Sequence, residues 1–197
     1  MTPLPTQLLI SLKIVVLIRL LDSVSSSPLF EHKESISSIN IIDGLVSIAF
    51  LKTLAMFGAF TEGLSLFASF AMLMNFPRFN KMKGMGQIVT WSVRDEAIHA
   101  ESVKRLFHQL QIESNIPLKS IEEDIISICK TTVNLEDKFI ELAFSLGDVQ
   151  GMTPNDIKNY IRYIADWRLT QLHLRPVHGY FEGSQGDYTQ KKEHPLP

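Results

Sequence analysis

Apolar residues dominate the chain between positions 45 and 76, where the run LVSIAFLKTLAMFGAFTEGLSLFASFAMLMNF is interrupted mainly by Lys52, Thr61 and Glu62. A run of this length could cross a membrane on hydropathy alone, but the charged residues inside it favour a different interpretation. A helix at the centre of a bundle is also apolar on every side. We therefore interpret this run as a core helix of a soluble helical bundle.

Two further helical patterns follow this run. Pro77 separates it from a helix that the pattern predicts over about 80–111, because proline favours a helix boundary. A third helix is predicted over about 118–146 and should end at Gly147, since glycine commonly follows the last helical residue. Very little of this part of the chain shows the alternation expected of strands.

The fourth helix has the clearest start signal. Thr153 can act as its N-cap, Pro154 suits the first helical position, and Asp156 completes a capping-box pattern. One face of the helix is apolar and consists of Ile157, Tyr160, Ile161, Ile164 and Trp167. The fold class predicted from these patterns is an all-α bundle of about four long helices.

The two ends of the chain differ from this helical region. Residues 8–21, LLISLKIVVLIRLL, are apolar but short, and Lys13 and Arg19 interrupt them, so we expect a helix packed on protein rather than a signal or membrane segment. Residues 22–40 are rich in serine and indicate a connector. We therefore expect residues 1–49 to form an N-terminal helix plus connector, and residues 177–197 to form a loose C-terminal tail.

Composition narrows the possible chemistry. The 197 residues are 45% hydrophobic and 20% charged, which is typical of a single globular domain, and the net charge of −2 provides no basic surface for nucleic acid. Cys129 is the only cysteine, which excludes a disulfide framework within the chain and fits a reducing, cytoplasmic location. Carboxylates and histidines remain as the candidate chemical groups.

The stretch WSVRDEAIH carries the strongest candidate site. Glu96 and His99 are three residues apart, so on a helix they lie on one face and can reach the same point. In helical bundles the Glu-x-x-His spacing recurs in two-metal carboxylate centres, with a further Glu from a neighbouring helix. Glu62, isolated in the apolar run, is the candidate for that Glu, because a buried carboxylate must be neutralised, paired or metal-bound.

Other interpretations fit the same residues. Glu-x-x-His also occurs by chance in soluble helices, and Glu62 could instead form an ion pair, for example with Lys52, or belong to a pore or an interface. Several other charged residues are expected on solvated faces: Glu101, His108, Glu122, Glu123 and Asp124. Phosphate-binding glycine loops and hydrolase triad patterns are absent from the sequence.

A family resemblance adds to this pattern. Residues 50–176 resemble the second half of the catalytic core of the small (β) subunit of class I ribonucleotide reductase. The resemblance is carried by the Arg-Asp-Glu-x-x-His sequence at residues 94–99, by the upstream Glu62, and by the segments LEDKFIELAF and DIKNYIRYIADWRLTQL. It implies a ferritin-like helical bundle over residues 50–176, incomplete relative to the family because only the second half is recognised.

The resemblance also implies roles for individual residues. Glu62, Glu96 and His99 correspond to three of the family's six iron ligands. Asp95 matches an aspartate that, in the family, hydrogen-bonds a ligating histidine and joins the radical-transfer route, and such carboxylates orient ligand imidazoles. Phe70 is expected to line the apolar pocket that shields the radical.

By the same resemblance, the chain is an oxidoreductase subunit for deoxyribonucleotide synthesis. The family's small subunit provides a di-iron tyrosyl-radical cofactor, with manganese as a possible metal, for reducing ribonucleoside diphosphates to deoxyribonucleoside diphosphates. The implied partners are a large (α) subunit and a second small subunit. No nucleic-acid or membrane partner is implied, and the expected location is cytoplasmic.

The sequence also departs from the family pattern. Residues 1–49 contain no second Glu-x-x-His, the radical tyrosine has no counterpart because the first tyrosine is Tyr160, and the tail that docks on the large subunit is expected to be missing. Three ligands are too few for a di-iron centre in one chain. We therefore expect a truncated or degenerate member that is not competent alone. Two alternatives are a non-catalytic interaction protein and a homodimer that assembles the site from two half-sites.

Overall fold

The computed structural model describes residues 36–184 and 187–191. The helix expected over residues 8–21 and most of the connector lie outside the described residues. Internal contacts divide the chain into two units, residues 1–49 and residues 50–197. In the first unit, residues 36–49 form the beginning of helix α2 (Ile36–Leu54).

The second unit is mainly helical, and the all-α class is confirmed. After α2 the chain forms these elements: a π-helix η2 (Ala55–Glu62), α3 (Phe67–Arg78), α4 (Lys83–Glu113), a short 3₁₀ helix η3 (Leu118–Ser120), α5 (Glu122–Ser145) and α6 (Pro154–Gln171). The expected loose tail differs from the structure, because β1 (Phe181–Ser184) and β2 (Asp187–Lys191) pair as antiparallel strands within it.

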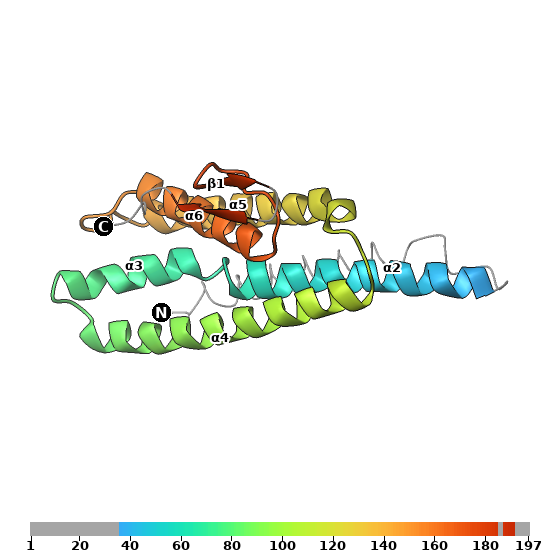
Figure 1. The fold of residues 1–197 in the computed structure, drawn as a ribbon. Coiled ribbons are helices and arrows are strands. Elements are labelled where there is room, and N and C mark those ends of the chain that lie inside the picture. Colours follow the sequence, from blue (N-terminus) through green and yellow to red (C-terminus); the bar gives the residue numbers. More distant parts are fainter. Residues whose placement is uncertain (1–35, 185–186, 192–197) are drawn as a thin grey trace. The chain divides into compact units, whose positions relative to one another are not determined.

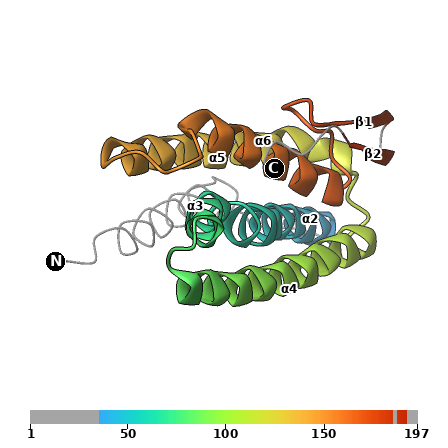
Figure 2. The same cartoon turned by 90° about the vertical axis from the view of Figure 1, so that its left-hand side faces the viewer.

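The helices of the second unit are stacked in layers. In both views α3 lies between α4 on one side and the α5–α6 pair on the other (Figure 1, Figure 2). The π-helix η2 contacts α4, α5 and α6. The core between these layers consists of fully buried apolar side chains, among them Phe60, Leu64, Phe107, Ile125, Ile140, Ile161 and Leu169. Cys129 is buried in this core as well.

The apolar run does not form the single helix that its composition predicts. It changes from α2 to η2, turns over residues 63–66, and continues as α3. The backbone N–H of Ser65 donates to the carbonyl of Phe60, five residues earlier, at 3.0 Å. A Cβ atom at Gly63 would lie 2.5 Å from the carbonyl oxygen of Ala59, so glycine is needed at this turn. Hydropathy could not reveal the break, because the residues on both sides of it are apolar.

The other helix boundaries follow the sequence closely. Thr153 accepts from the backbone N–H of Asp156, whose carboxylate accepts from the backbone N–H of Thr153, so the predicted capping box at the start of α6 is confirmed. Pro77, expected between helices, instead lies in the last turn of α3. It packs against α4 at Gly86, where a Cβ atom would lie only 2.5 Å from the Cγ atom of Pro77.

The segment Asp43–Arg78, in which an 18-residue window has a mean hydropathy of 1.6, is long and apolar enough to cross a membrane by length and composition. A core helix of a helical bundle meets the same criteria. Within this segment Lys52 forms an ion pair with Asp124 of α5, with 2.5 Å between Nζ and Oδ2. Lys52 is therefore not the ion-pair partner that could have neutralised Glu62.

Candidate metal centre

Glu62 is the last residue of η2, immediately before the turn at Gly63. Its side chain is half-buried, and its Oε2 atom is fully buried without a hydrogen-bond partner among the residues that the structure describes. A buried carboxylate oxygen that accepts no hydrogen bond costs about 1–3 kcal/mol or more. Local folding therefore leaves this oxygen available to a ligand that can compensate its charge.

Glu96 and His99 face Glu62 from the middle of α4. Oε2 of Glu96 lies 3.8 Å from Nδ1 of His99, and the two side chains are 23% and 58% exposed. One ligand atom from each of Glu62, Glu96 and His99 can be chosen so that all three lie within 4.8 Å of one another. Segments 34 residues apart in the sequence thus deliver two carboxylates and one imidazole to a single point.

Close contact between η2 and α4 produces this convergence. A Cβ atom at Gly58 would lie 2.5 Å from the Cβ atom of Val103, so the glycine allows the two helices to approach each other. Glu62 lies four residues after Gly58, and His99 lies four residues before Val103. Because the two helices meet at this point, the side chains one turn away on each helix are brought together.

The donor set suits a divalent transition metal. Carboxylate oxygens and a neutral imidazole nitrogen are common ligands of iron, manganese and zinc. The three residues fit one metal ion, and the buried, unpartnered oxygen of Glu62 is the observation that favours one. A centre of two metals in a helical bundle needs four carboxylates and two histidines, so the described residues supply half of that set.

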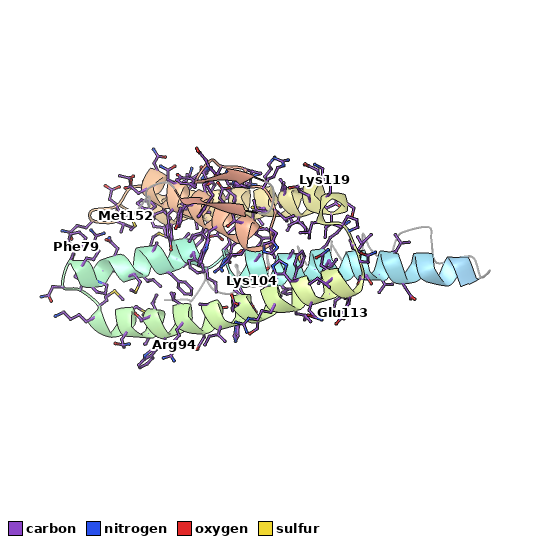
Figure 3. All side chains as sticks on the ribbon, viewed as in Figure 1. Phe79, Arg94, Lys104, Glu113, Lys119 and Met152 are labelled. Carbon is purple, nitrogen blue, oxygen red and sulfur yellow. The ribbon has the colours of Figure 1, made fainter. Side chains whose placement is uncertain are left out.

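The two other predicted site residues lie outside the convergent group. Asp95 is exposed on α4, as is its neighbour Arg94, which lies on the side of α4 away from α3 (Figure 3). Phe70 is half-buried in α3 and packs edge-to-face on Phe67, with 5.8 Å between ring centroids. The predicted roles of Asp95 and Phe70 in radical transfer and radical shielding stay predictions.

Sequence reasoning missed Arg168, which is 5% exposed and donates from Nε to the carbonyl oxygen of Gly63 at 2.9 Å. Its guanidinium also donates to the Gln171 side chain and lies 4.5 Å from the Trp167 ring. Burial lowers the pKa of Arg168 to about 10. The side chain therefore fixes the turn that directly follows Glu62. A signal was present, because Arg168 follows Ile164 by four residues on the apolar face of α6.

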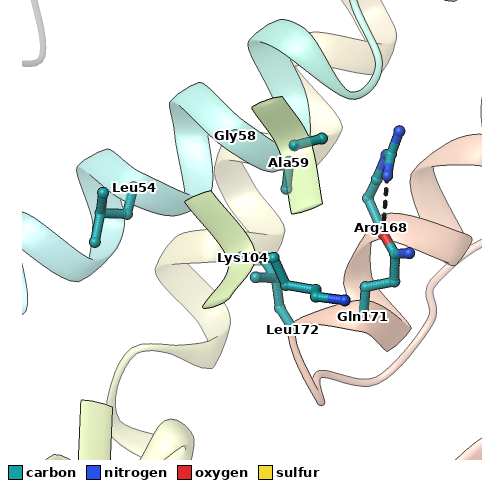
Figure 4. A pocket seen from close by; sticks show the side chains of 8 residues that line it. Leu54, Gly58, Ala59, Lys104, Arg168, Gln171 and Leu172 are labelled. Carbon is teal, nitrogen blue, oxygen red and sulfur yellow. Dashed lines mark hydrogen bonds between the residues drawn. The ribbon is translucent and has the colours of Figure 1, made fainter. Parts of the chain in front are cut away.

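A small pocket lies beside this arginine. It is lined by Leu54, Gly58, Ala59, Ala100, Lys104, Arg168, Gln171 and Leu172 (Figure 4). Lys104 forms an ion pair with Glu101 of the same helix. Because its lining includes none of the three convergent residues, the pocket is distinct from the candidate metal centre.

A helical bundle in which one helix supplies a Glu and its neighbour a Glu-x-x-His pair has the ligand pattern of ferritin-like carboxylate metal proteins. Comparison with known families agrees with this class. The model of the family described as "Ribonucleotide reductase, small chain" matches residues 16–182. The chain belongs to this family.

Individual relatives point the same way. The chain is 44% identical over 131 residues to the "Probable ribonucleoside-diphosphate reductase small subunit 048L" of Invertebrate iridescent virus 3, an alignment that covers 66% of this chain and 35% of the relative. It is 39% identical over 147 residues to the corresponding protein, 376L, of Invertebrate iridescent virus 6, covering 63% of this chain and 41% of the relative. The chain thus spans about two-fifths or less of the length of these relatives.

A solved structure supports the fold. The chain is similar to the "putative class I ribonucleotide reductase from Bacillus halodurans", with a TM-score of 0.63 and 23% sequence identity. The similarity covers 80% of this chain and 55% of that structure. At this identity the comparison establishes the shared helical fold, and the ligand assignment depends on the geometry of the three convergent residues.

Proposed function

We propose that this chain acts as the metal-binding part of a ribonucleoside-diphosphate reductase small subunit, with Glu62, Glu96 and His99 as metal ligands. The observation that carries the proposal is the convergence of these three side chains, together with the buried Oε2 atom of Glu62, which has no hydrogen-bond partner in the described structure. Membership of the small-chain family supports iron as the metal, with manganese as the alternative. The reaction served is reduction of ribonucleoside diphosphates to deoxyribonucleoside diphosphates.

When bound in such a site, iron or manganese supplies one-electron oxidation chemistry that amino-acid side chains cannot provide. The chain's own residues would bind the metal and hold its ligands in position. Glu62 contributes an anionic oxygen from the end of η2, and Glu96 and His99 contribute an oxygen and a nitrogen from one face of α4. Arg168 donates a hydrogen bond to the carbonyl of Gly63, and we propose that holding this turn helps to position Glu62.

The proposal also includes two residues outside the ligand group, Phe70 and Asp95. The side chains of Phe67 and Phe70 pack on each other in the first turn of α3, and Phe67 is buried. Phe70 would exclude water from the region next to Glu62, and Asp95 would hold a ligating imidazole in position. These two roles belong to the proposal.

The proposed partners and location follow the family. A large (α) subunit would hold the nucleotide substrate, and a second small subunit would complete a dimer. The proposed location is the cytoplasm. The described residues of one copy supply three of the six donors that a two-metal centre needs, and we propose that this chain alone is not competent for reduction.

Metal titration tests the central point. We expect the purified chain to bind Mn²⁺. Binding is measured as the loss of the electron paramagnetic resonance signal of free aqueous Mn²⁺. Glu62→Gln and His99→Gln should each weaken binding at least about 10- to 100-fold, since even residues that only orient ligands have effects of this size.

Glu101→Gln is the matched control for this titration. Glu101 lies on the same helix as Glu96 but pairs with Lys104 and Arg105 instead of joining the convergent group. Its replacement should leave Mn²⁺ binding unchanged. Equal affinities in the chain and in Glu62→Gln would contradict the proposed site, and would favour a chain that packs with other proteins without metal chemistry.

A further inference from the structure

The small pocket beside Arg168 has a positively charged lining. Lys104 of α4 and Arg168 of α6 both border it, and its lining residues include no aspartate or glutamate. Gln171 is the third residue with a polar side chain at the pocket, and it is hydrogen-bonded to Arg168 (Figure 4). Two helices that are far apart in the sequence therefore present two positive charges to the same small space.

The charge of Arg168 meets only neutral acceptors. Its Nε atom donates to the carbonyl oxygen of Gly63 and its Nη1 atom to the side-chain oxygen of Gln171, both at 2.9 Å. The rings of Trp167 and Phe67, with centroids 4.5 and 5.7 Å from the guanidinium carbon, offset part of the charge. Among the residues that the structure describes, Arg168 forms no ion pair with a carboxylate. A buried cation with neutral partners favours an anion beside it.

One carboxylate stands near these cations, and it is already shared. Glu101 pairs with Lys104 through Oε2 and with Arg105 through Oε1. Hydrogen bonds from these two residues keep the pKa of Glu101 below its ordinary value. Its charge also acts to raise the pKa of Arg168, but burial has the larger effect and lowers that pKa. Three cations thus face one anion, and positive charge is in excess around the pocket.

The side-chain groups that remain unused at the pocket are hydrogen-bond donors. The ammonium group of Lys104 has three N–H bonds, and Glu101 accepts from one of them. Gln171 accepts from Arg168 through its oxygen, which leaves its amide N–H₂ group as a donor. The guanidinium of Arg168 has further N–H bonds beyond the two that are used. Spare donors without spare acceptors suit an anion better than water, because water must also donate its own protons.

The size of the pocket limits the anion that it can hold. Its volume is about 10 Å³, which is close to the space that one water-sized particle needs. Gly58, Ala59 and Ala100 leave this space open, because they carry no side chain or a single methyl group. Phosphate and organic carboxylates have several heavy atoms and are too large. Chloride, a single atom with one negative charge, matches both the size and the charge.

We propose that this pocket binds one monatomic anion, chloride, held by Lys104, Arg168 and Gln171. The site goes beyond the proposed function, because none of these residues is a proposed metal ligand. A bound anion would offset the charge of Arg168, whose guanidinium holds the carbonyl of Gly63. It would also link α4 to α6, since Lys104 and Arg168 come from different helices. Chloride should therefore stabilise the folded chain by mass action.

A chloride titration of the full chain tests the proposal, with a chelator present so that metal binding does not contribute. Sodium gluconate replaces sodium chloride to keep the ionic strength constant, since gluconate is too large for the pocket. We expect the melting temperature to rise and then saturate, with a gain of about 3–6 °C at roughly ten times the dissociation constant. The chlorine nuclear magnetic resonance line of free chloride should broaden when the chain is added.

Two variants should move the chloride affinity in opposite directions. Lys104→Gln removes a cationic donor and should weaken binding about 10- to 100-fold. Glu101→Gln removes the competing carboxylate and should tighten binding. Lys158→Gln is the matched control, because Lys158 also pairs with a glutamate and its side chain is 22% exposed, compared with 24% for Lys104. The control should leave the affinity unchanged.

Several outcomes would overturn the proposal. A melting temperature that rises without saturation, or equally in Lys104→Gln and Lys158→Gln, would indicate a general salt effect. A folded chain that does not respond to chloride would show that the pocket holds at most a water molecule. Weaker binding in Glu101→Gln would show that the carboxylate does not compete for the site. None of these outcomes bears on the Mn²⁺ titration, and circular dichroism checks that each variant is folded.

Discussion

Asp166 and Glu62 both have buried carboxylate oxygens, but the surroundings of these oxygens are very different. Asp166 of α6 is fully buried and accepts from the backbone N–H groups of Val177, His178 and Tyr180 at 2.8–3.1 Å. Glu62 of η2 buries an oxygen that accepts no hydrogen bond among the described residues. Asp166 is compensated by described backbone groups, whereas no described residue donates a hydrogen bond to Oε2 of Glu62.

Whether a buried carboxylate accepts hydrogen bonds distinguishes a carboxylate that stabilises the fold from one that serves as a ligand. Asp166 fixes the chain segment after α6 because it collects backbone donors from three residues of one turn. Residues close to Asp166 in the sequence thus donate the hydrogen bonds that compensate its buried charge. Oε2 of Glu62 has no hydrogen-bond partner among the described residues, which is the condition expected of a metal ligand before the cation binds.

Replacing Asp166 should have the largest effect on stability. Asp166→Asn keeps the shape but puts an amide N–H₂ group where backbone donors converge, so we expect a loss of about 3 kcal/mol or more. The free energy of unfolding in urea measures it. Asp148→Asn, at an exposed position, should change stability by less than about 0.5 kcal/mol. Equal effects of the two variants would show that the Asp166 hydrogen bonds contribute little.

Arg168 connects the two regions of the comparison, and its replacement should affect both. Arg168→Met keeps apolar contact with Trp167 but leaves the Gly63 carbonyl unpaired, so we expect a loss of about 1–3 kcal/mol. Mn²⁺ affinity should also fall about 10-fold, because the turn after Glu62 loosens.

Arg175→Met is the control for this variant. Arg175 forms more exposed ion pairs with Glu122 and Glu123, and such pairs contribute at most about 1 kcal/mol. Its loss should leave Mn²⁺ affinity unchanged. If Arg168→Met is destabilised but binds Mn²⁺ normally, then Arg168 supports the fold and does not position Glu62.

Glu62→Gln should change stability in the opposite direction from Asp166→Asn. Without metal, the substitution removes an uncompensated charge, so we expect the variant to be about 1 kcal/mol more stable than the chain in the presence of a chelator. With Mn²⁺ at 100 times its dissociation constant, the unsubstituted chain should gain about 2.7 kcal/mol that the variant lacks. Thermal unfolding with and without Mn²⁺ measures both, and a Glu62→Gln variant that is less stable in chelator would contradict the comparison.

The helical class and most of the α4 to α6 boundaries could be predicted from sequence because their signals are local. The capping box at Thr153 and Asp156 and the glycine at position 147 act within one turn of chain. At the break after Glu62, the carbonyl of Gly63 accepts a hydrogen bond from Arg168, 105 residues away, and no local pattern could show that contact. The β1–β2 hairpin was missed because its polar residues lack the alternation of a half-buried strand.

The candidate site residues could be named from the sequence, but their convergence could not. Spacing alone placed Glu96 and His99 on one face of a helix, and the apolar surroundings of Glu62 marked it as unusual. That these residues converge depends on the close approach of Gly58 and Val103, which is a tertiary contact.

The smallest predicted effect concerns pH. Burial lowers the pKa of His178 below its ordinary value of 6.5, and the nearby Asp166 carboxylate only partly offsets this. The folded chain therefore binds fewer protons than the unfolded chain just below pH 6.5, so stability should fall as the pH is lowered through 6.5 and level off below the folded pKa. Urea unfolding between pH 7.5 and 5.5 measures the slope, which one proton limits to about 1.4 kcal/mol per pH unit. Burial also lowers the pKa of His173, so His173 contributes to the same slope. We therefore expect His178→Gln to reduce the slope without abolishing it. A free energy of unfolding that rises as the pH falls would refute the assignment.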